Sequence, residues 1–196
     1  EAVDVGSNQM SRDFRAWIDE VDDLGLLKTV EGADWDEEIG AIADANSKRN
    51  KYTLLFDKIK DHPQGFRLLM GALLDSRRVA LALGLSPTLN DLELVTVLRE
   101  RLQTAGQKLA EFAPREVKDA PVLENSLDPV DMLKFPAPKY FEGDGGRYIG
   151  TAHAVMTRDP DSDWVNMGVY RMMVQDRNTL SILFEAVRHA RFIIKK

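Results

Sequence analysis

The sequence contains no cysteine. This absence excludes disulfide scaffolds, thiolate zinc sites and cysteine nucleophiles. Long apolar runs are also missing, since no segment approaches the ~20 residues that a membrane-spanning helix needs. The N-terminus lacks the basic and then apolar pattern of a secretory signal. We therefore expect a cytoplasmic protein that has no membrane partner.

Negatively charged residues also outnumber positively charged ones. Lysine and arginine number 26 against 32 aspartate and glutamate residues, and the formal net charge is −6. The chain therefore has neither the electrostatic footprint of a nucleic-acid-binding protein nor a basic amphipathic face for anionic lipid. An acidic protein that binds an anion must concentrate positive charge locally, through an arginine, a metal ion or a helix N-terminus.

Apolar spacing in the first part of the chain alternates between the helical and the strand period. The predicted helices cover 11–24, a segment capped by Asp36, 75–83 and 90–103, and the predicted strands cover 26–30, 52–56 and 66–70. Gly25 and Gly84 follow two of these helices as stop signals. This alternation indicates a fold of the α/β (α+β) class.

Composition changes after Pro114, where prolines and then glycines become frequent. We place a domain boundary near 115, which predicts a frayed tail at 1–10, an α/β domain at 11–115 and a second domain at 116–196. The second domain is predicted to contain strands at 148–157 and 164–174, joined by a turn as an antiparallel pair, and a helix over 185–196. One strand pair and one helix bury too little apolar surface to form a stable domain. We therefore expect the chain to be the N-terminal portion of a larger enzyme.

The segment Trp164-Val-Asn-Met-Gly-Val-Tyr-Arg171 carries the strongest chemical signal. In a strand, Asn166 and Gly168 face one side, while Arg171 faces the other. A buried asparagine needs a polar partner, a strand glycine often marks close approach of a ligand, and an arginine presents a planar fork to a carboxylate. The same pattern also fits an edge strand with a bulge at Gly168 and a surface arginine.

His189 lies on the predicted final helix. A lone histidine is more often a surface or hydrogen-bonded residue than a metal ligand. Paired with the amide oxygen of an asparagine and a carboxylate, however, its imidazole suits manganese better than zinc, because no thiolate is present.

Asn166-Met-Gly-Val-Tyr-Arg171, followed by Gln175-Asp-Arg-Asn-Thr179 and then His189, resembles the UbiD family of prenylated-FMN-dependent decarboxylases. The likeness extends upstream through Asp144-Gly-Gly-Arg-Tyr-Ile149 and through weaker segments nearer the N-terminus. It covers about residues 11–196.

This resemblance implies that residues from 116 onward begin a split β-barrel that binds prenylated FMN, with Mn²⁺ bridging the flavin phosphate to the protein and K⁺ as a further candidate ion. By position, Asn166 and His189 would be metal ligands, and Arg171 would be the catalytic arginine that pairs with a glutamate and orients the substrate carboxylate. The implied cofactor-binding residues are Asn166, Met167, Gly168, Val169, Arg171, Arg188 and His189. Arg188 departs from the family pattern, where a neutral residue or a histidine is usual, and it would place a cation near the cofactor.

The implied reaction is the reversible decarboxylation of an aromatic or α,β-unsaturated carboxylic acid, in a homo-oligomer assembled through C-terminal regions. The family's third metal ligand and two catalytic glutamates would lie beyond Lys196. Two other interpretations stay open, a non-catalytic UbiD-like subunit that binds flavin or a partner chain, and an ordinary flavin electron-transfer domain. The sequence names neither the substrate acid nor the direction of the reaction.

Overall fold

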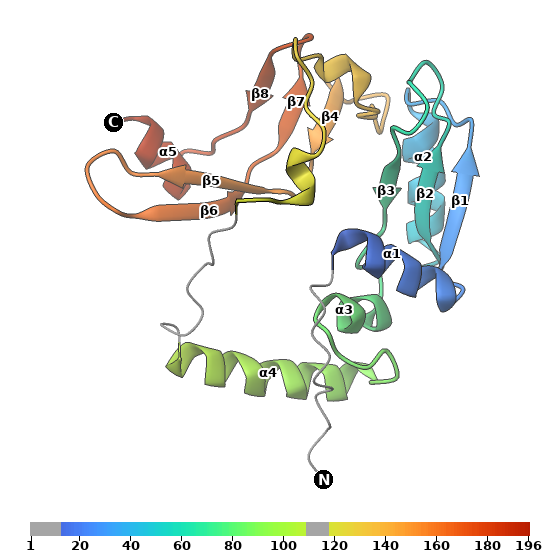
Figure 1. Cartoon of the computed structure of the whole chain (residues 1–196), viewed down its shortest axis with the longest axis vertical. Helices are drawn as coiled ribbons and strands as arrows, with labels where there is room; N and C mark the ends of the chain where they lie inside the picture. Colours follow the sequence, from blue (N-terminus) through green and yellow to red (C-terminus); the bar gives the residue numbers. More distant parts are fainter. Residues whose placement is uncertain (1–12, 109–117) are drawn as a thin grey trace. The chain divides into compact units, whose positions relative to one another are not determined.

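The computed structural model describes residues 13–108 and 118–196 (Figure 1). The helices are α1 (Phe14–Asp23), α2 (Glu38–Ser47), α3 (Ser76–Ala82), α4 (Asp91–Gln107) and α5 (His189–Ile194), with short 3₁₀ turns at Pro121–Leu123 and Met132–Lys134. The strands are β1 (Leu27–Glu31), β2 (Thr53–Asp57), β3 (Leu68–Met70), β4 (Arg147–Gly150), β5 (Ala154–Arg158), β6 (Val165–Val169), β7 (Met172–Val174) and β8 (Leu180–Ile182). This mixture of helices and sheets confirms the predicted fold class.

The described residues divide into two compact units that are each discontinuous in sequence. The first comprises 13–29, 45–55, 69–108 and 118–126, and the second comprises 30–44, 56–68 and 127–196. The predicted tail at 1–10 and the predicted boundary near 115 lie outside the described residues. The division into domains at 11–115 and 116–196 therefore stays a prediction.

Local capping chemistry explains where the N-terminal helices begin and end. The Asp13 carboxylate caps α1 by accepting from the Ala16 N–H at 2.8 Å, and Gly25 ends it with φ +67°. Asn90 and Glu93 form a reciprocal capping box at the start of α4. The helix predicted after Asp36 instead begins at Glu38, so Asp36 is not its cap; it forms an isolated bridge with Lys139.

The first unit has an apolar core between α1 and α3. Trp17, Val21, Leu26 and Leu81 form a buried cluster, and burial of each such side chain contributes roughly 1.5–3 kcal/mol. A second cluster of Ala80, Leu85 and Leu94 joins α3 to α4. None of the helices in the described ranges is long and apolar enough to cross a membrane.

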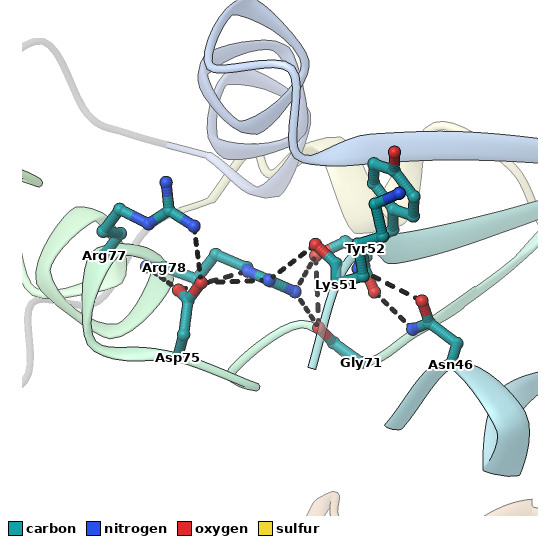
Figure 2. A network of polar contacts seen from close by, with 8 residues as sticks. Asn46, Lys51, Tyr52, Gly71, Asp75, Arg77 and Arg78 are labelled. Atoms are coloured by element: carbon teal, nitrogen blue, oxygen red, sulfur yellow. Dashed lines mark hydrogen bonds and ion pairs between the residues drawn. The ribbon is translucent and has the colours of Figure 1, made fainter. Parts of the chain in front are cut away.

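A buried arginine organises the polar interior of this unit (Figure 2). Arg78 is fully buried and donates to both carboxylate oxygens of Asp75, from Nε at 3.2 Å and from Nη2 at 3.0 Å. It also donates to the carbonyl oxygens of Lys51 and Gly71 and to the Thr53 hydroxyl, at 3.2–3.4 Å. One charged side chain therefore connects the start of α3 to β2 and to the loop after β3.

In the second unit, each of the two long predicted strands is interrupted. The segment 148–157 forms β4 and β5, while 164–174 forms β6 and β7, and β8 was not predicted. β4, β7 and β8 form one antiparallel sheet in the order β4-β7-β8, and β5 pairs with β6 in a separate hairpin (Figure 1). The first break has a local cause, because the His153 ring folds back onto Gly150, which has no side chain to obstruct it.

Arg147 anchors the beginning of β4. Its guanidinium lies over the Trp35 ring at 4.4 Å, and it donates to the carbonyl oxygens of Phe135 and Ala137 at 3.0 and 2.8 Å. It also contacts Nε2 of His62 at 2.8 Å. Burial lowers the pKa of Arg147 from its ordinary value. These contacts hold β4 in place for the site described next.

Candidate functional site

Tyr170 joins the motif strand β6 to helix α5. Its hydroxyl oxygen accepts from the backbone N–H of Ala190 at 3.2 Å and from the Asn166 side-chain amide at 3.3 Å. Tyr170 and Asn166 are 6% and 7% exposed, and Ala190 is fully buried. Because Ala190 directly follows His189, this hydroxyl connects the two predicted metal-ligand positions through two buried hydrogen bonds.

The predicted alternation of faces along β6 is confirmed. Asn166 and Tyr170 are buried, whereas Met167 and Val169 are 70% and 63% exposed, and Arg171 is also exposed. β5 and β6 pair without a break in register, with Asn166 opposite Thr157 and Gly168 opposite Val155. The bulge at Gly168 in the alternative interpretation is therefore wrong, whereas its edge strand and surface arginine are confirmed, because β6 belongs to a two-stranded sheet and Arg171 is exposed.

Gly168 has a structural explanation within the chain. A Cβ atom built there would meet the Tyr170 ring at 2.6–2.9 Å, so the absent side chain makes room for that ring. The glycine thus allows Tyr170 to lie back along the strand and to place its hydroxyl beside Asn166. Its predicted role beside a cofactor stays a prediction.

The Asn166 amide has a geometry that fits a metal ligand. Its nitrogen donates to the hydroxyls of Tyr170 and Thr157, at 3.3 and 3.4 Å. Across the described ranges, its carbonyl oxygen has no hydrogen-bond partner. An oxygen oriented by two contacts on its own nitrogen, and itself unpaired, is the kind of donor that Mn²⁺ accepts.

His189 begins α5 on the exposed surface of this unit. Its ring meets the Trp164 ring edge to face, with 5.2 Å between centroids, and Trp164 directly precedes β6. Helix α5 also contacts β5 and β6 (Figure 1). The fold thus brings His189 to the strand that carries Asn166. Within 13–108 and 118–196, no three His, Asp or Glu side chains gather as a metal site. The roles of Asn166 and His189 as metal ligands therefore stay predictions.

A pocket of about 310 Å³ opens where the two long predicted strands are interrupted. It is lined by Thr151, Val169, Tyr170, Arg171, Leu183, Glu185 and Arg188. Thr151 lies in the first break and Arg171 in the second. The Thr151 side chain bonds to Tyr140, whose pKa is raised by burial. The interruptions missed by the sequence patterns therefore create the concave surface.

The two arginines in this pocket are in different electrostatic states. Arg188 donates from Nε to the Glu185 carboxylate at 2.9 Å. Arg171 has no hydrogen bond or ion pair from its guanidinium to any residue that the structure describes. Instead, its guanidinium lies over the Tyr148 ring, 5.2 Å from the centroid. Arg171 is thus a cation with free donors, whereas Arg188 already has a counter-charge.

Residue patterns missed part of this arrangement. Tyr170, Tyr148, Thr151 and Glu185 were not assigned a role in the site. Tyr170 had a usable signal, since it lies four residues after Asn166 on the same strand face. Tyr148 and Thr151 had none, because their relation to Arg171 depends on which strands pair.

Comparison with known proteins assigns both parts of the chain. Residues 18–102 match the 3-octaprenyl-4-hydroxybenzoate carboxy-lyase N-terminal domain, and residues 115–196 match the Rift-related domain of the same carboxy-lyase. The pyrrole-2-carboxylic acid decarboxylase of Pseudomonas aeruginosa is 35% identical over 185 residues, which is 89% of this chain and 36% of that protein.

Solved structures share the fold. The vanillic acid decarboxylase of Sedimentibacter hydroxybenzoicus in its closed form matches 95% of this chain with a TM-score of 0.79 at 24% identity. An evolved dimeric form of the UbiD-class enzyme HmfF from Pelotomaculum thermopropionicum, in complex with prFMN, matches 92% with a TM-score of 0.73 at 26% identity. The chain spans 40% of each of these structures. The two matched domains, at residues 18–102 and 115–196, are both domains of the same carboxy-lyase. On this evidence the chain belongs to the UbiD family.

Proposed function

We propose that this chain is the N-terminal portion of a prenylated-FMN-dependent carboxy-lyase that decarboxylates an aromatic or α,β-unsaturated acid. One observation carries the proposal: Arg171 lines a pocket with its donors unpaired among the described residues, on the same motif as Asn166. Relatives named as decarboxylases of pyrrole-2-carboxylic acid and ferulic acid support the reaction class. A structure of HmfF in complex with prFMN supports the cofactor.

The residues of this chain would have the following roles. The Arg171 guanidinium would bind the substrate carboxylate through two parallel N–H donors and orient the bond that breaks. The Asn166 oxygen and a His189 nitrogen would hold Mn²⁺ and so neutralise part of the flavin phosphate's charge, with K⁺ as an additional ion. When bound, the prenylated flavin would supply the electron sink for the pair left by departing carbon dioxide.

The remaining parts of the proposal concern the whole protein. The third metal ligand and the catalytic glutamates would belong to the additional length that the relatives carry. Reversibility, a cytoplasmic location and a homo-oligomeric assembly are included in the proposal. Met167, Gly168, Val169 and Arg188 would line the cofactor beside the two metal ligands.

The test uses the full-length protein loaded with prenylated flavin. Arg171→Ala should lower carbon dioxide release by on the order of a hundredfold or more while the flavin absorption band is retained, because substrate orientation is lost but the proposed metal ligands Asn166 and His189 are kept. Arg158→Ala is a matched control, since Arg158 is an exposed arginine at the end of β5. Retained turnover in Arg171→Ala would contradict the role proposed for it. Flavin binding without carbon dioxide release from any acid tested would favour a non-catalytic subunit.

A further inference from the structure

We infer that Tyr148 is a positioning residue for Arg171, an inference that rests on the proposed function. The Arg171 guanidinium lies over the Tyr148 ring, 5.2 Å from its centroid. Tyr148 is half-buried and belongs to β4, while Arg171 lies between β6 and β7. Tyr148 does not line the pocket, so it would act through Arg171 and not on the substrate.

Strand pairing places these two side chains together. β4 pairs with β7 in antiparallel register, with Tyr148 opposite Met173. Arg171 lies two residues before Met173, on the side where the register shifts between Tyr148 and Gly150, and its long side chain reaches the Tyr148 ring. The Tyr148 N–H donates to the Pro138 carbonyl at 2.9 Å, and the Leu183 N–H donates to the Arg171 carbonyl at 3.1 Å. Both backbones are therefore held by contacts independent of the ring and the cation.

An aromatic ring is a suitable support for an arginine that must bind a carboxylate. The ring face attracts the cation through its quadrupole and limits the rotamers of a long side chain. It does not occupy the N–H donors at the edge of the guanidinium, as a carboxylate partner would. Arg188 shows the contrast within the same pocket, because the Glu185 carboxylate already accepts from its Nε.

This arrangement determines the net charge of the pocket lining that the structure describes. Arg171 and Arg188 contribute two positive charges to the pocket lining, and Glu185 compensates one of them. The described lining therefore offers one uncompensated cation, supported by Tyr148.

The experiment compares Tyr148→Leu and Tyr148→Phe in the full-length holoenzyme. Loss of the ring should raise KM, and the Kd of benzoate for the cofactor-free protein measured by calorimetry, about 5- to 30-fold, the range of one cation–π contact. Tyr148→Phe keeps the ring face and should stay within about twofold of the parent. A merely structural role would instead lower the folded fraction and kcat, and leave KM and Kd unchanged.

Further variants keep this test decisive. Tyr148→Met is a second non-aromatic variant, to be used if Tyr148→Leu does not fold. Tyr52→Leu is a matched control, because Lys51 lies over the Tyr52 ring at 4.9 Å in the other unit. In an Arg171→Ala background, Tyr148→Leu should add no further loss of benzoate affinity.

The outcomes separate this inference from the proposed function. If Arg171→Ala loses benzoate binding and turnover but both Tyr148→Leu and Tyr148→Met retain them, the positioning role is overturned and the proposed function stands. If Arg171→Ala itself retains both, the catalytic role of Arg171 fails, and the inference about Tyr148 fails with it.

Discussion

The hydroxyl of Tyr170 accepts the backbone N–H of Ala190 at 3.2 Å, at a position where Ala190 is fully buried. The same hydroxyl is the partner of the Asn166 amide. One side chain thus satisfies the first turn of α5 and orients the asparagine on β6. The spacing between Asn166 and His189 therefore depends on a tyrosine that binds neither metal nor substrate in the proposal.

Tyr170→Phe should destabilise the protein and loosen its metal site. Removing the hydroxyl leaves the buried Ala190 N–H without a partner, which costs roughly 1–3 kcal/mol of unfolding free energy. Urea unfolding and the manganese content of the purified full-length protein measure the two effects. Tyr140→Phe, which removes the hydroxyl of a half-buried tyrosine from the same unit, is the control for metal content. Unchanged stability together with full metal occupancy would contradict the linking role of Tyr170.

Asn166→Ala and His189→Ala should each weaken Mn²⁺ binding to the full-length protein. Loss of an outer-shell partner of a metal ligand already costs about 10–100-fold in affinity, so loss of a ligand should cost at least as much. Asn178→Ala, at an exposed turn of the same unit, should bind Mn²⁺ normally. Native mass spectrometry would report both metal and flavin. Normal manganese retention in both ligand variants would rule out the proposed pair.

Arg78→Met should be strongly destabilising, whereas Arg77→Met should be nearly neutral. The substitution removes the buried guanidinium that donates to Asp75 and to three backbone or hydroxyl oxygens, and breaking a buried ion pair costs roughly 3–5 kcal/mol. Arg77 also pairs with Asp75, at 3.1 Å, but it is half exposed, and surface pairs contribute about 0–1 kcal/mol. Chemical denaturation of both variants provides the measurement. Equal losses of unfolding free energy in the two variants would show that burial of Arg78 does not determine how much its ion pair with Asp75 contributes.

Asp75 should make the stability of the protein sensitive to acid. Burial by itself raises the pKa of this carboxyl, but the backbone N–H and guanidinium of Arg78 outweigh it and hold the pKa below its ordinary value. A lowered folded-state pKa stabilises the fold above the unfolded pKa of about 3.9, and this contribution is lost as pH falls through the folded pKa.

Asp75→Asn tests this linkage, because asparagine can still cap α3. The variant should be less stable than the parent at pH 7, and the difference should shrink as the pH falls below about 4. Urea midpoints at a series of pH values would show this convergence. A difference that stays constant down to the acid transition would mean that the charge of Asp75 does not contribute.

Gly40→Ala should destabilise the protein even though Gly40 lies inside helix α2. In an exposed helix, this change is favourable by about 0.8–1 kcal/mol. Here a Cβ atom would overlap the backbone of Tyr140, which cannot move as easily as the end of a side chain. We expect a loss of roughly 1–3 kcal/mol. Gly106→Ala in α4, where a Cβ meets nothing, is the matched control and should be neutral or stabilising.

The amino-acid sequence by itself determined the features that depend on near neighbours along the chain. Glycines marked the helix ends at Gly25 and Gly84, and alternation along 166–171 placed Asn166 and Arg171 on opposite faces. These features were predictable because a helix turn or a strand pleat is formed by residues a few positions apart.

The tertiary structure decided where the strands break and which side chains meet across the breaks. Continuous apolar spacing at 148–157 and 164–174 concealed the interruptions at Thr151 and Arg171, because a strand that changes sheets keeps its local period. The contacts of Tyr148 with Arg171, and of Tyr170 with Ala190, join positions far apart in sequence. They depend on strand register and helix docking, which result from packing of the whole unit and leave no periodic signal in the sequence.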